Sequence, residues 1–353
     1  MYKVAVAGSC SLSVALFEAV YNHPDFNIEF VLTAPPKPAG RGKKLRPTEL
    51  TQAAVEKKVD VVFVDTFKKK SPSEFAAFDI EELKNTDKKL KFPPILSNAQ
   101  IKKVVDFTKL DFVFVFSFGK LIPNRFLNAV KFGWFNWHPS PLPLLRGATP
   151  IETSILQGFD RSELCVFKMV KELDAGDILY RKEFDILPYW TALDLRVKIQ
   201  ELTKDTFEEV AECLKGYSKG KFDLKPQIGE PTFCYKYVKE DAYLRFEDAA
   251  QDERIIRAFY GSLWARTNYK GKLLKVLKAV ALKEVEGITE KSSEPGRVIA
   301  ADKKRGLIVA CKRGFLKFME VLPEGKKALK SLDFINGYRV QVGDKFESFR
   351  SRD

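Results

Sequence analysis

Residues 134–151 read WFNWHPSPLPLLRGATPI, and the rest of the chain is best understood by working outward from them. The apolar run predicts a short buried strand over 134–137, the prolines that follow predict a loop, and a helix is expected over 150–157. Asn136 and His138 therefore stand at the carboxyl end of a strand, which is the edge where parallel α/β sheets bind ligands. Residues two apart in a strand share a face, so both side chains can enter one cleft.

The residues around this stretch predict alternating strands and helices. We expect strands over 3–8, 28–32, 59–64, 111–116, 164–169 and 180–187, and helices over 11–21 and 191–214. This order is typical of a Rossmann-like α/β unit with a mainly parallel sheet. Residues 8–13 read GSCSLS, and this single glycine in place of G-x-G-x-x-G argues against a nicotinamide cofactor.

The last third of the chain has a different pattern. Short alternating segments over 273–280, 296–300, 306–311 and 316–321 predict a small antiparallel barrel of the OB type. Residues 216–221 read GYSKGK, which is typical of a linker. We therefore predict a catalytic domain over 1–215, a linker over 216–230 and a β-barrel domain over 231–353.

Composition indicates a globular protein that does not cross a membrane. The chain has 353 residues, of which 45% are hydrophobic, and no apolar stretch approaches the ~20 residues that span a bilayer. Met1 to Val4 lead directly into a strand, so we expect no cleaved signal. The five cysteines are scattered and include no Cys-x-x-Cys pair, which favours a reducing compartment and gives no support to a metal site.

The net charge of +13 favours an acidic partner such as a nucleic acid. Residues 231–353 hold 26 lysines and arginines against 17 aspartates and glutamates, which leaves +9 in this segment. Because many lysine-rich proteins bind no nucleic acid, the charge alone does not decide the partner.

The stretch around His138 resembles the signature of the folate-dependent formyltransferases, in which an Asn-x-His-x-Ser-x-Leu-Pro run precedes Arg-Gly-x-x-Pro-Ile. The matching residues are Asn136, His138, Ser140, Leu142, Pro143, Arg146, Gly147, Pro150 and Ile151. The family's third catalytic group is an aspartate in a Leu-Asp-x-Gly-Asp loop, and residues 173–177 read LDAGD. The resemblance implies that Asn136, His138 and Asp174 are catalytic and that Asp177 has a supporting role in the folate site.

The resemblance also implies 10-formyltetrahydrofolate as cosubstrate. In the family, backbone groups of the turn after the central strand line the pteridine pocket, and this turn corresponds to Phe118 and Gly119. The signature loop also contacts the folate, which adds Ser140, Pro141, Leu142 and Pro143. The alternative interpretations are structural: a tight strand-to-helix turn, loop scaffolding, and an Asp174 carboxylate that caps its own turn.

Further segments resemble the methionyl-tRNA formyltransferase branch of the family. Residues 38–44 read PAGRGKK, like the loop with which this branch engages initiator tRNA, and this implies tRNA contacts by Arg41, Lys43 and Lys44. The alternative is a solvated connector. Residues 246–260 and 323–328 resemble the branch's C-terminal domain. Residues 67–93, rich in lysine and carboxylates, have no counterpart and are expected at the surface.

Three functions remain open. The favoured one is formyl transfer from 10-formyltetrahydrofolate to methionyl initiator tRNA. The second is formyl transfer to a small amine such as an amino sugar nucleotide, and the third is a non-catalytic RNA-binding protein, against which the complete set of Asn136, His138 and Asp174 argues. For the first function we expect a monomer in the bacterial cytoplasm, or in the matrix of an organelle that initiates translation with formylmethionine.

Overall fold

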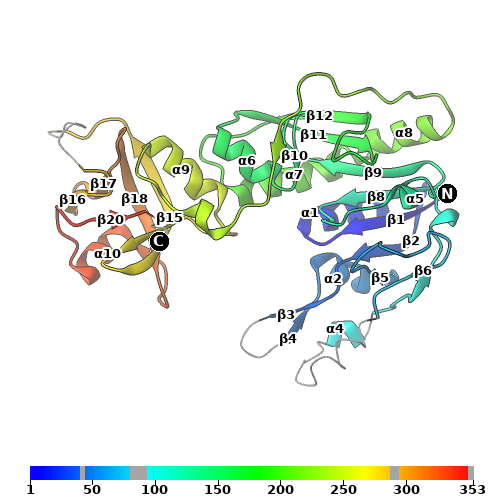
Figure 1. The fold of residues 1–353 in the computed structure, drawn as a ribbon, viewed down its shortest axis with the longest axis horizontal. Helices are drawn as coiled ribbons and strands as arrows, with labels where there is room; N and C mark the ends of the chain where they lie inside the picture. Colours follow the sequence, from blue (N-terminus) through cyan, green and yellow to red (C-terminus); the bar gives the residue numbers. More distant parts are fainter. Residues whose placement is uncertain (40–43, 80–93, 98, 287–293, 349–353) are drawn as a thin grey trace. The chain divides into compact units, whose positions relative to one another are not determined.

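The computed structural model describes residues 1–39, 44–79, 94–97, 99–286 and 294–348 (Figure 1). The chain forms two compact units, each assembled from three segments. The first unit contains residues 1–148, 162–184 and 196–233, and the second contains 149–161, 185–195 and 234–353. The division predicted from the sequence, with a catalytic domain over 1–215, a linker over 216–230 and a second domain over 231–353, remains a prediction.

A seven-stranded sheet forms the centre of the first unit, in the order β12-β11-β9-β8-β1-β2-β5 (Figure 1). The strands are β1 (Tyr2–Gly8), β2 (Phe26–Thr33), β5 (Val61–Phe63), β8 (Phe112–Phe116), β9 (Gly133–His138), β11 (Arg161–Lys168) and β12 (Ile178–Asp185). Strands β5, β2, β1, β8 and β9 are parallel, whereas β11 is antiparallel to β9. The mainly parallel Rossmann-like sheet is thus confirmed, and its strand order reverses between β1 and β8, where such sheets bind ligands.

The apolar runs in the sequence become strands that are covered on both faces. All five residues of β8 are buried, and so are Val4 to Gly8 of β1. Trp134 at the start of β9 is fully buried, and its indole Nε1 donates to the Phe126 carbonyl at 2.9 Å. A continuous hydrophobic run without alternation is what a doubly covered parallel strand requires.

The helices of this part of the chain are α1 (Ser11–Tyr21), α2 (Glu49–Glu56), α4 (Pro94–Ser97), α5 (Asn124–Leu127), α7 (Ala192–Asp205) and α8 (Phe207–Ser218). The single helix predicted over 191–214 was wrong, because α7 and α8 are separate. The hydroxyls of Thr203 and Thr206 donate to the carbonyls four residues earlier at 2.7 and 2.8 Å, a contact that bends helices. Helix α8 continues to Ser218, so the predicted linker begins within a helix.

Short elements complete the first unit. They are the paired strands β3 (Lys37–Ala39) and β4 (Lys44–Arg46), the paired strands β6 (Phe75–Ala76) and β7 (Val104–Val105), the strand β10 (Arg146–Gly147) and the 3-10 turn at Phe107–Lys109. Strand β13 (Phe233–Cys234) spans the point in the sequence where the second unit resumes.

The second unit is built on a curled antiparallel sheet in the order β16-β17-β18-β15-β14-β20, with β19 paired to β18. Its elements are α6 (Pro150–Gln157), a 3-10 turn (Lys239–Ala242), α9 (Ala249–Ala258), β14 (Arg266–Tyr269), β15 (Lys272–Leu282), β16 (Val298–Asp302), β17 (Gly306–Ala310), β18 (Phe315–Pro323), β19 (Leu329–Lys330), α10 (Ser331–Tyr338) and β20 (Phe346–Glu347). Backbone hydrogen bonds join the two ends of the sheet, from Val298 N to Asp344 O at 2.7 Å and from Phe346 N to Gly296 O at 2.8 Å. The predicted barrel-like antiparallel unit is therefore confirmed.

Candidate functional site

His138 is the last residue of β9, and its ring is buried with 4% of its surface exposed. Its Nε2 lies 2.9 Å from the Leu145 carbonyl oxygen. Because a carbonyl oxygen only accepts hydrogen bonds, Nε2 carries the hydrogen, and Nδ1 of the neutral ring presents its lone pair. The signature loop turns back to supply this carbonyl, with Leu145 in the left-handed region at φ 56°.

Asp174 faces the other ring nitrogen of His138. Its Oδ2 lies 3.8 Å from His138 Nδ1, too far for a hydrogen bond, and accepts one from the Gly147 amide at 2.8 Å. The Asp174 side chain is 11% exposed. A carboxylate at this distance attracts a positive charge that develops on the imidazole during a proton transfer. The structure thus brings together two of the three residues predicted as catalytic.

Asn136, the third, lies two residues before His138 on β9, so its side chain points to the same face of the sheet. Asn136 is partly exposed, and its side-chain amide has no hydrogen-bond partner among the residues that the structure describes. Its N–H groups can therefore donate to a ligand.

The turn after β8 lies at the reversal of strand order. Gly119 has φ 65°, and nothing lies within 4 Å of where a β-carbon would stand, so its backbone borders open space. Phe118 is 5% exposed, and its ring packs edge-on against the Phe67 ring, with 6.2 Å between the ring centroids. A ligand at this turn would therefore meet the Phe118 backbone rather than its ring.

The residues predicted for folate contact in the signature loop have internal partners. The Ser140 hydroxyl donates to Leu144 O at 2.7 Å, and Leu142 and Pro143 are buried. Pro141 is partly exposed, and so it is the member of this run with surface available to a ligand. Asp177 is exposed, and its main-chain oxygen accepts from Lys168 N at 2.9 Å.

Two residues that the sequence did not indicate tie this site together. The Gln227 amide donates to the main-chain oxygens of Asp174 and Gly176 at 2.8 and 2.9 Å, and its oxygen accepts from Arg146 at 2.7 and 3.1 Å. Thr232 accepts from Leu145 N through its hydroxyl and from Arg146 N through its carbonyl, both at 2.9 Å. No motif in the sequence points to either residue: Gln227 lies in the predicted linker 216–230, and Thr232 lies just beyond it.

The predicted tRNA contacts are only partly described. Arg41 and Lys43 lie outside the described residues, and so do residues 80–93 of the charged stretch 67–93. Lys44 begins β4 and is exposed.

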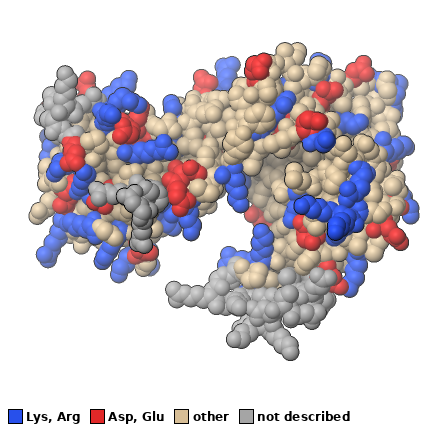
Figure 2. Space-filling model, viewed as in Figure 1, with Lys and Arg blue, Asp and Glu red and all other residues tan. Residues whose placement is uncertain are grey.

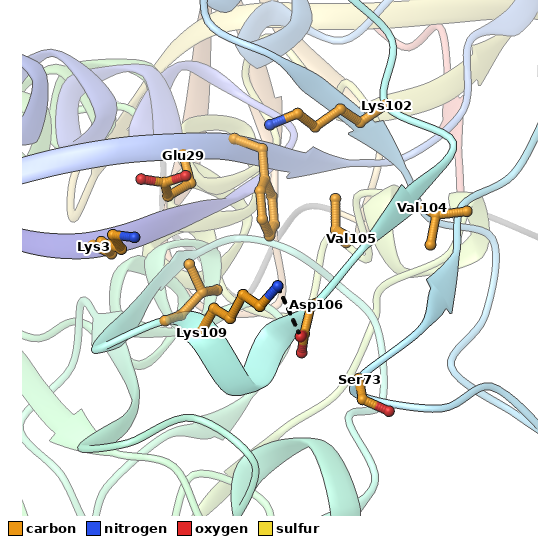
Figure 3. A pocket seen from close by; sticks show the side chains of 10 residues that line it. Lys3, Glu29, Ser73, Lys102, Val104, Val105, Asp106 and Lys109 are labelled. Atoms are coloured by element: carbon orange, nitrogen blue, oxygen red, sulfur yellow. Dashed lines mark ion pairs between the residues drawn. The ribbon is translucent and has the colours of Figure 1, made fainter.

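A separate hollow of about 300 Å³ lies at the opposite end of the parallel strands (Figure 3). Lys3, Glu29 and Lys102 are among its lining residues, and Lys109 pairs with Asp106 at 3.7 Å beside them. Lys3 is near the start of β1, whereas His138 ends β9, so this hollow is not part of the site. Within the described part of the chain, no group of three or more His, Cys, Asp or Glu could hold a metal ion. No helix in that part is long and apolar enough to span a membrane.

Comparison with known proteins adds independent findings. A family model described as formyl transferase matches residues 2–211, and one described as formyl transferase, C-terminal domain, matches residues 236–339. A methionyl-tRNA formyltransferase from Dictyoglomus thermophilum is 32% identical over 98% of this chain and 100% of its own length.

Two solved structures share the fold. HypX from Aquifex aeolicus in complex with tetrahydrofolic acid has a TM-score of 0.55 at 17% identity, covering 99% of this chain and 51% of its own. An N-formyltransferase from Helicobacter canadensis, in complex with folinic acid and dTDP-3-aminofucose, has a TM-score of 0.54 at 15% identity, covering 92% and 99%.

Proposed function

The chain belongs to the formyl transferase family, and we propose that it transfers the formyl group of 10-formyltetrahydrofolate to the α-amino group of methionyl initiator tRNA. One observation supports this choice of acceptor: the 32% identical methionyl-tRNA formyltransferase matches 98% of this chain and 100% of its own length. The N-formyltransferase structure in complex with dTDP-3-aminofucose is only 15% identical, a level that indicates a common fold. We therefore favour the tRNA acceptor over a small amine.

The residues present fit a folate donor. The open backbone at Gly119 and the Asn136 side-chain amide, which has no partner among the described residues, are features that a bound ligand would use. Folate contacts by Phe118, Gly119, Ser140, Pro141, Leu142, Pro143 and Asp177 belong to this proposal.

Asn136 is assigned the role of oxyanion donor. When the amine attacks the formyl carbon, negative charge develops on the formyl oxygen, and a preorganised amide N–H stabilises it. Loss of one such donor in other acyl-transfer sites costs roughly 3 kcal/mol. This role needs an amide without a competing partner, which is the state of Asn136 among the described residues.

His138 is assigned the proton transfers. Its Nε2–H is held by Leu145 O, so Nδ1 is the atom that can take the proton lost by the attacking amine. The same proton is then returned to the folate nitrogen as its bond to the formyl carbon breaks. The Asp174 carboxylate, 3.8 Å from Nδ1, stabilises the positive ring between these two transfers.

Charge supports an RNA acceptor. Residues 231–353 carry a net +9, and Lys and Arg side chains are spread over the visible face of the second unit (Figure 2). Lys303, Lys304 and Arg305 are exposed in the turn between β16 and β17. Together with Arg41, Lys43 and Lys44, such side chains would neutralise phosphates, so we expect the KM for tRNA to rise steeply with salt. The corresponding location is a compartment where translation begins with formylmethionine.

The test is formyl transfer from 10-formyltetrahydrofolate to charged initiator tRNA, with an amino sugar nucleotide as the competing acceptor. The chain has two histidines, which provides a matched pair of variants, His138→Ala and His23→Ala. We expect label on methionyl-tRNA with wild type and His23→Ala, and none with His138→Ala. Label only on the small amine would show that tRNA is not the acceptor. Transfer by His138→Ala at the wild-type rate would show that His138 does not carry the proton transfers.

A further inference from the structure

We propose that Gln227 is a positioning residue for formyl transfer, which holds the Asp174 loop against the signature loop and so fixes Asp174 opposite His138. The predicted effect of Gln227 on the rate of formyl transfer rests on the proposed function. Gln227 follows α8 in the stretch that the sequence presents as a linker, and its side chain is half-buried within the first unit.

The Gln227 carboxamide uses its full hydrogen-bonding capacity. Its two N–H groups go to the carbonyls of Asp174 and Gly176, and its oxygen accepts both Nε and Nη2 of Arg146. The four contacts fix the orientation of the amide, because the reversed group would place its oxygen against two carbonyl oxygens and its N–H groups against a guanidinium. Gln227 therefore connects two loops that are distant in sequence through a single rigid plane.

The connection reaches the catalytic pair directly. Arg146 precedes Gly147, whose amide donates to Asp174 Oδ2, and Arg146 follows Leu145, whose carbonyl holds His138 Nε2. Asp174 is thus held at its carboxylate by Gly147 and at its carbonyl by Gln227. Its φ of 46° lies in the left-handed region, which aspartate adopts more readily than most non-glycine residues, and the two contacts hold it there.

The residues on either side of Gln227 are attached to the same two loops. Lys225 exchanges backbone hydrogen bonds with Ile178 at 2.7 and 2.9 Å, just beyond the Asp174 loop. Thr232 bonds the backbone of Leu145 and Arg146. Residues 225–232 therefore form part of the wall of the site rather than a passive connection, and Gln227 is the side chain that reaches Asp174.

Two substitutions separate positioning from simple support of the fold. Gln227→Met keeps the length and removes all four hydrogen bonds, whereas Gln227→Glu keeps the acceptors for Arg146 and loses both donors to the carbonyls. Gln200→Met on α7 is the matched control, because Gln200 donates to the Arg196 carbonyl at 3.2 Å and contacts neither loop. We expect kcat to fall about 10- to 100-fold in both Gln227 variants, with KM changed less than about threefold, and no change in Gln200→Met.

A second readout does not depend on activity. Since His23 is the only other histidine, the ring C–H proton signals of His138 can be assigned by nuclear magnetic resonance with the His23→Ala variant. In Gln227→Met the His138 signals should move while those of His23 stay, and in Gln200→Met neither should move. If wild type transfers no formyl group but the His138 signals respond, the proposed function fails and the positioning role stands.

The opposite results would overturn the proposal. These are His138 signals in Gln227→Met identical to wild type, or wild-type kcat in Gln227→Glu. A lowered melting temperature with kcat per folded molecule unchanged would also overturn it, because that result means that Gln227 supports only the fold.

Discussion

The substitution Gly176→Ala should displace the carboxylate that faces His138. A β-carbon on Gly176 would lie 1.7 Å from the main-chain oxygen of Lys168, whereas ordinary contact begins at 3.4 Å. About 1.7 Å of backbone movement is therefore required. Lys168 ends β11, which is hydrogen-bonded into the sheet, so the Asp174 loop must supply most of the movement. A displacement of about 1 Å at a catalytic group lowers rates about 100-fold, which corresponds to about 2.7 kcal/mol in the barrier.

The assay is single-turnover formyl transfer at saturating substrate, with the unfolding transition recorded for the same preparation. Gly337→Ala is the control, because Gly337 in α10 has nothing within 4 Å of the new β-carbon and no positive φ. We expect the rate to fall by roughly two orders of magnitude in Gly176→Ala and to stay unchanged in Gly337→Ala. A folded Gly176→Ala protein with the wild-type rate would refute both the rigidity of the loop and the role of Asp174.

Three further predictions concern stability and reactivity. Burial raises the pKa of Asp252 to about 6, so the folded state holds this proton more tightly than the unfolded state, in which the pKa is about 3.9. Unfolding free energy should therefore fall by ~2 kcal/mol as pH rises from 4 to 7. Asp252→Asn, compared by urea unfolding at each pH, should lack that part of the decline. Burial raises the pKa of the Cys165 thiol to about 12, so iodoacetamide at pH 8 should modify the partly exposed Cys10 first, and mass spectrometry showing equal labelling would contradict this. Trp134→Phe removes the indole donor from the Phe126 carbonyl, which keeps the Ala129 amide at 3.3 Å, and should lower unfolding free energy by ~0.5–1.5 kcal/mol. An unchanged unfolding free energy would mean that the indole hydrogen bond makes no net contribution.

The sequence predicted those helices and strands whose limits are set by residues within or next to the element. The helix over 11–21 and the helix over 150–157 agree with α1 and α6 at both ends. Helix α6 has Pro150 in its first turn and ends at Gly158 in the left-handed region, and both residue types act on the backbone where they stand. The strand over 111–116 was likewise predictable, because five buried apolar residues in succession fit a covered strand.

The features that were missed depend on contacts distant in sequence or on competition within a helix. Gln227 lies 53 residues from Asp174 and 81 from Arg146, and one side chain that joins them leaves no periodic signal. The break between α7 and α8 arises where the hydroxyls of Thr203 and Thr206 bond carbonyls of the same helix, although the apolar spacing continues through it. The resemblance supplied His138 and Asp174 as a pair, and the structure adds the backbone groups that hold them.

The Leu145 carbonyl and the Gly147 amide determine which role His138 and Asp174 can each have in the proposed chemistry. The only ring nitrogen of His138 within hydrogen-bond distance of a described residue is Nε2, which is held by Leu145 O at 2.9 Å, so the carbonyl sets the orientation of the ring and its neutral tautomer. Asp174 at 3.8 Å from Nδ1 leaves room for a proton donor to approach that lone pair and acts on the ring through its charge. A carboxylate bonded directly to Nδ1 would occupy the atom that must receive the proton. The gap between Asp174 and His138 is therefore a requirement of the proposed chemistry, and Gly147 and Gln227 hold Asp174 at that distance.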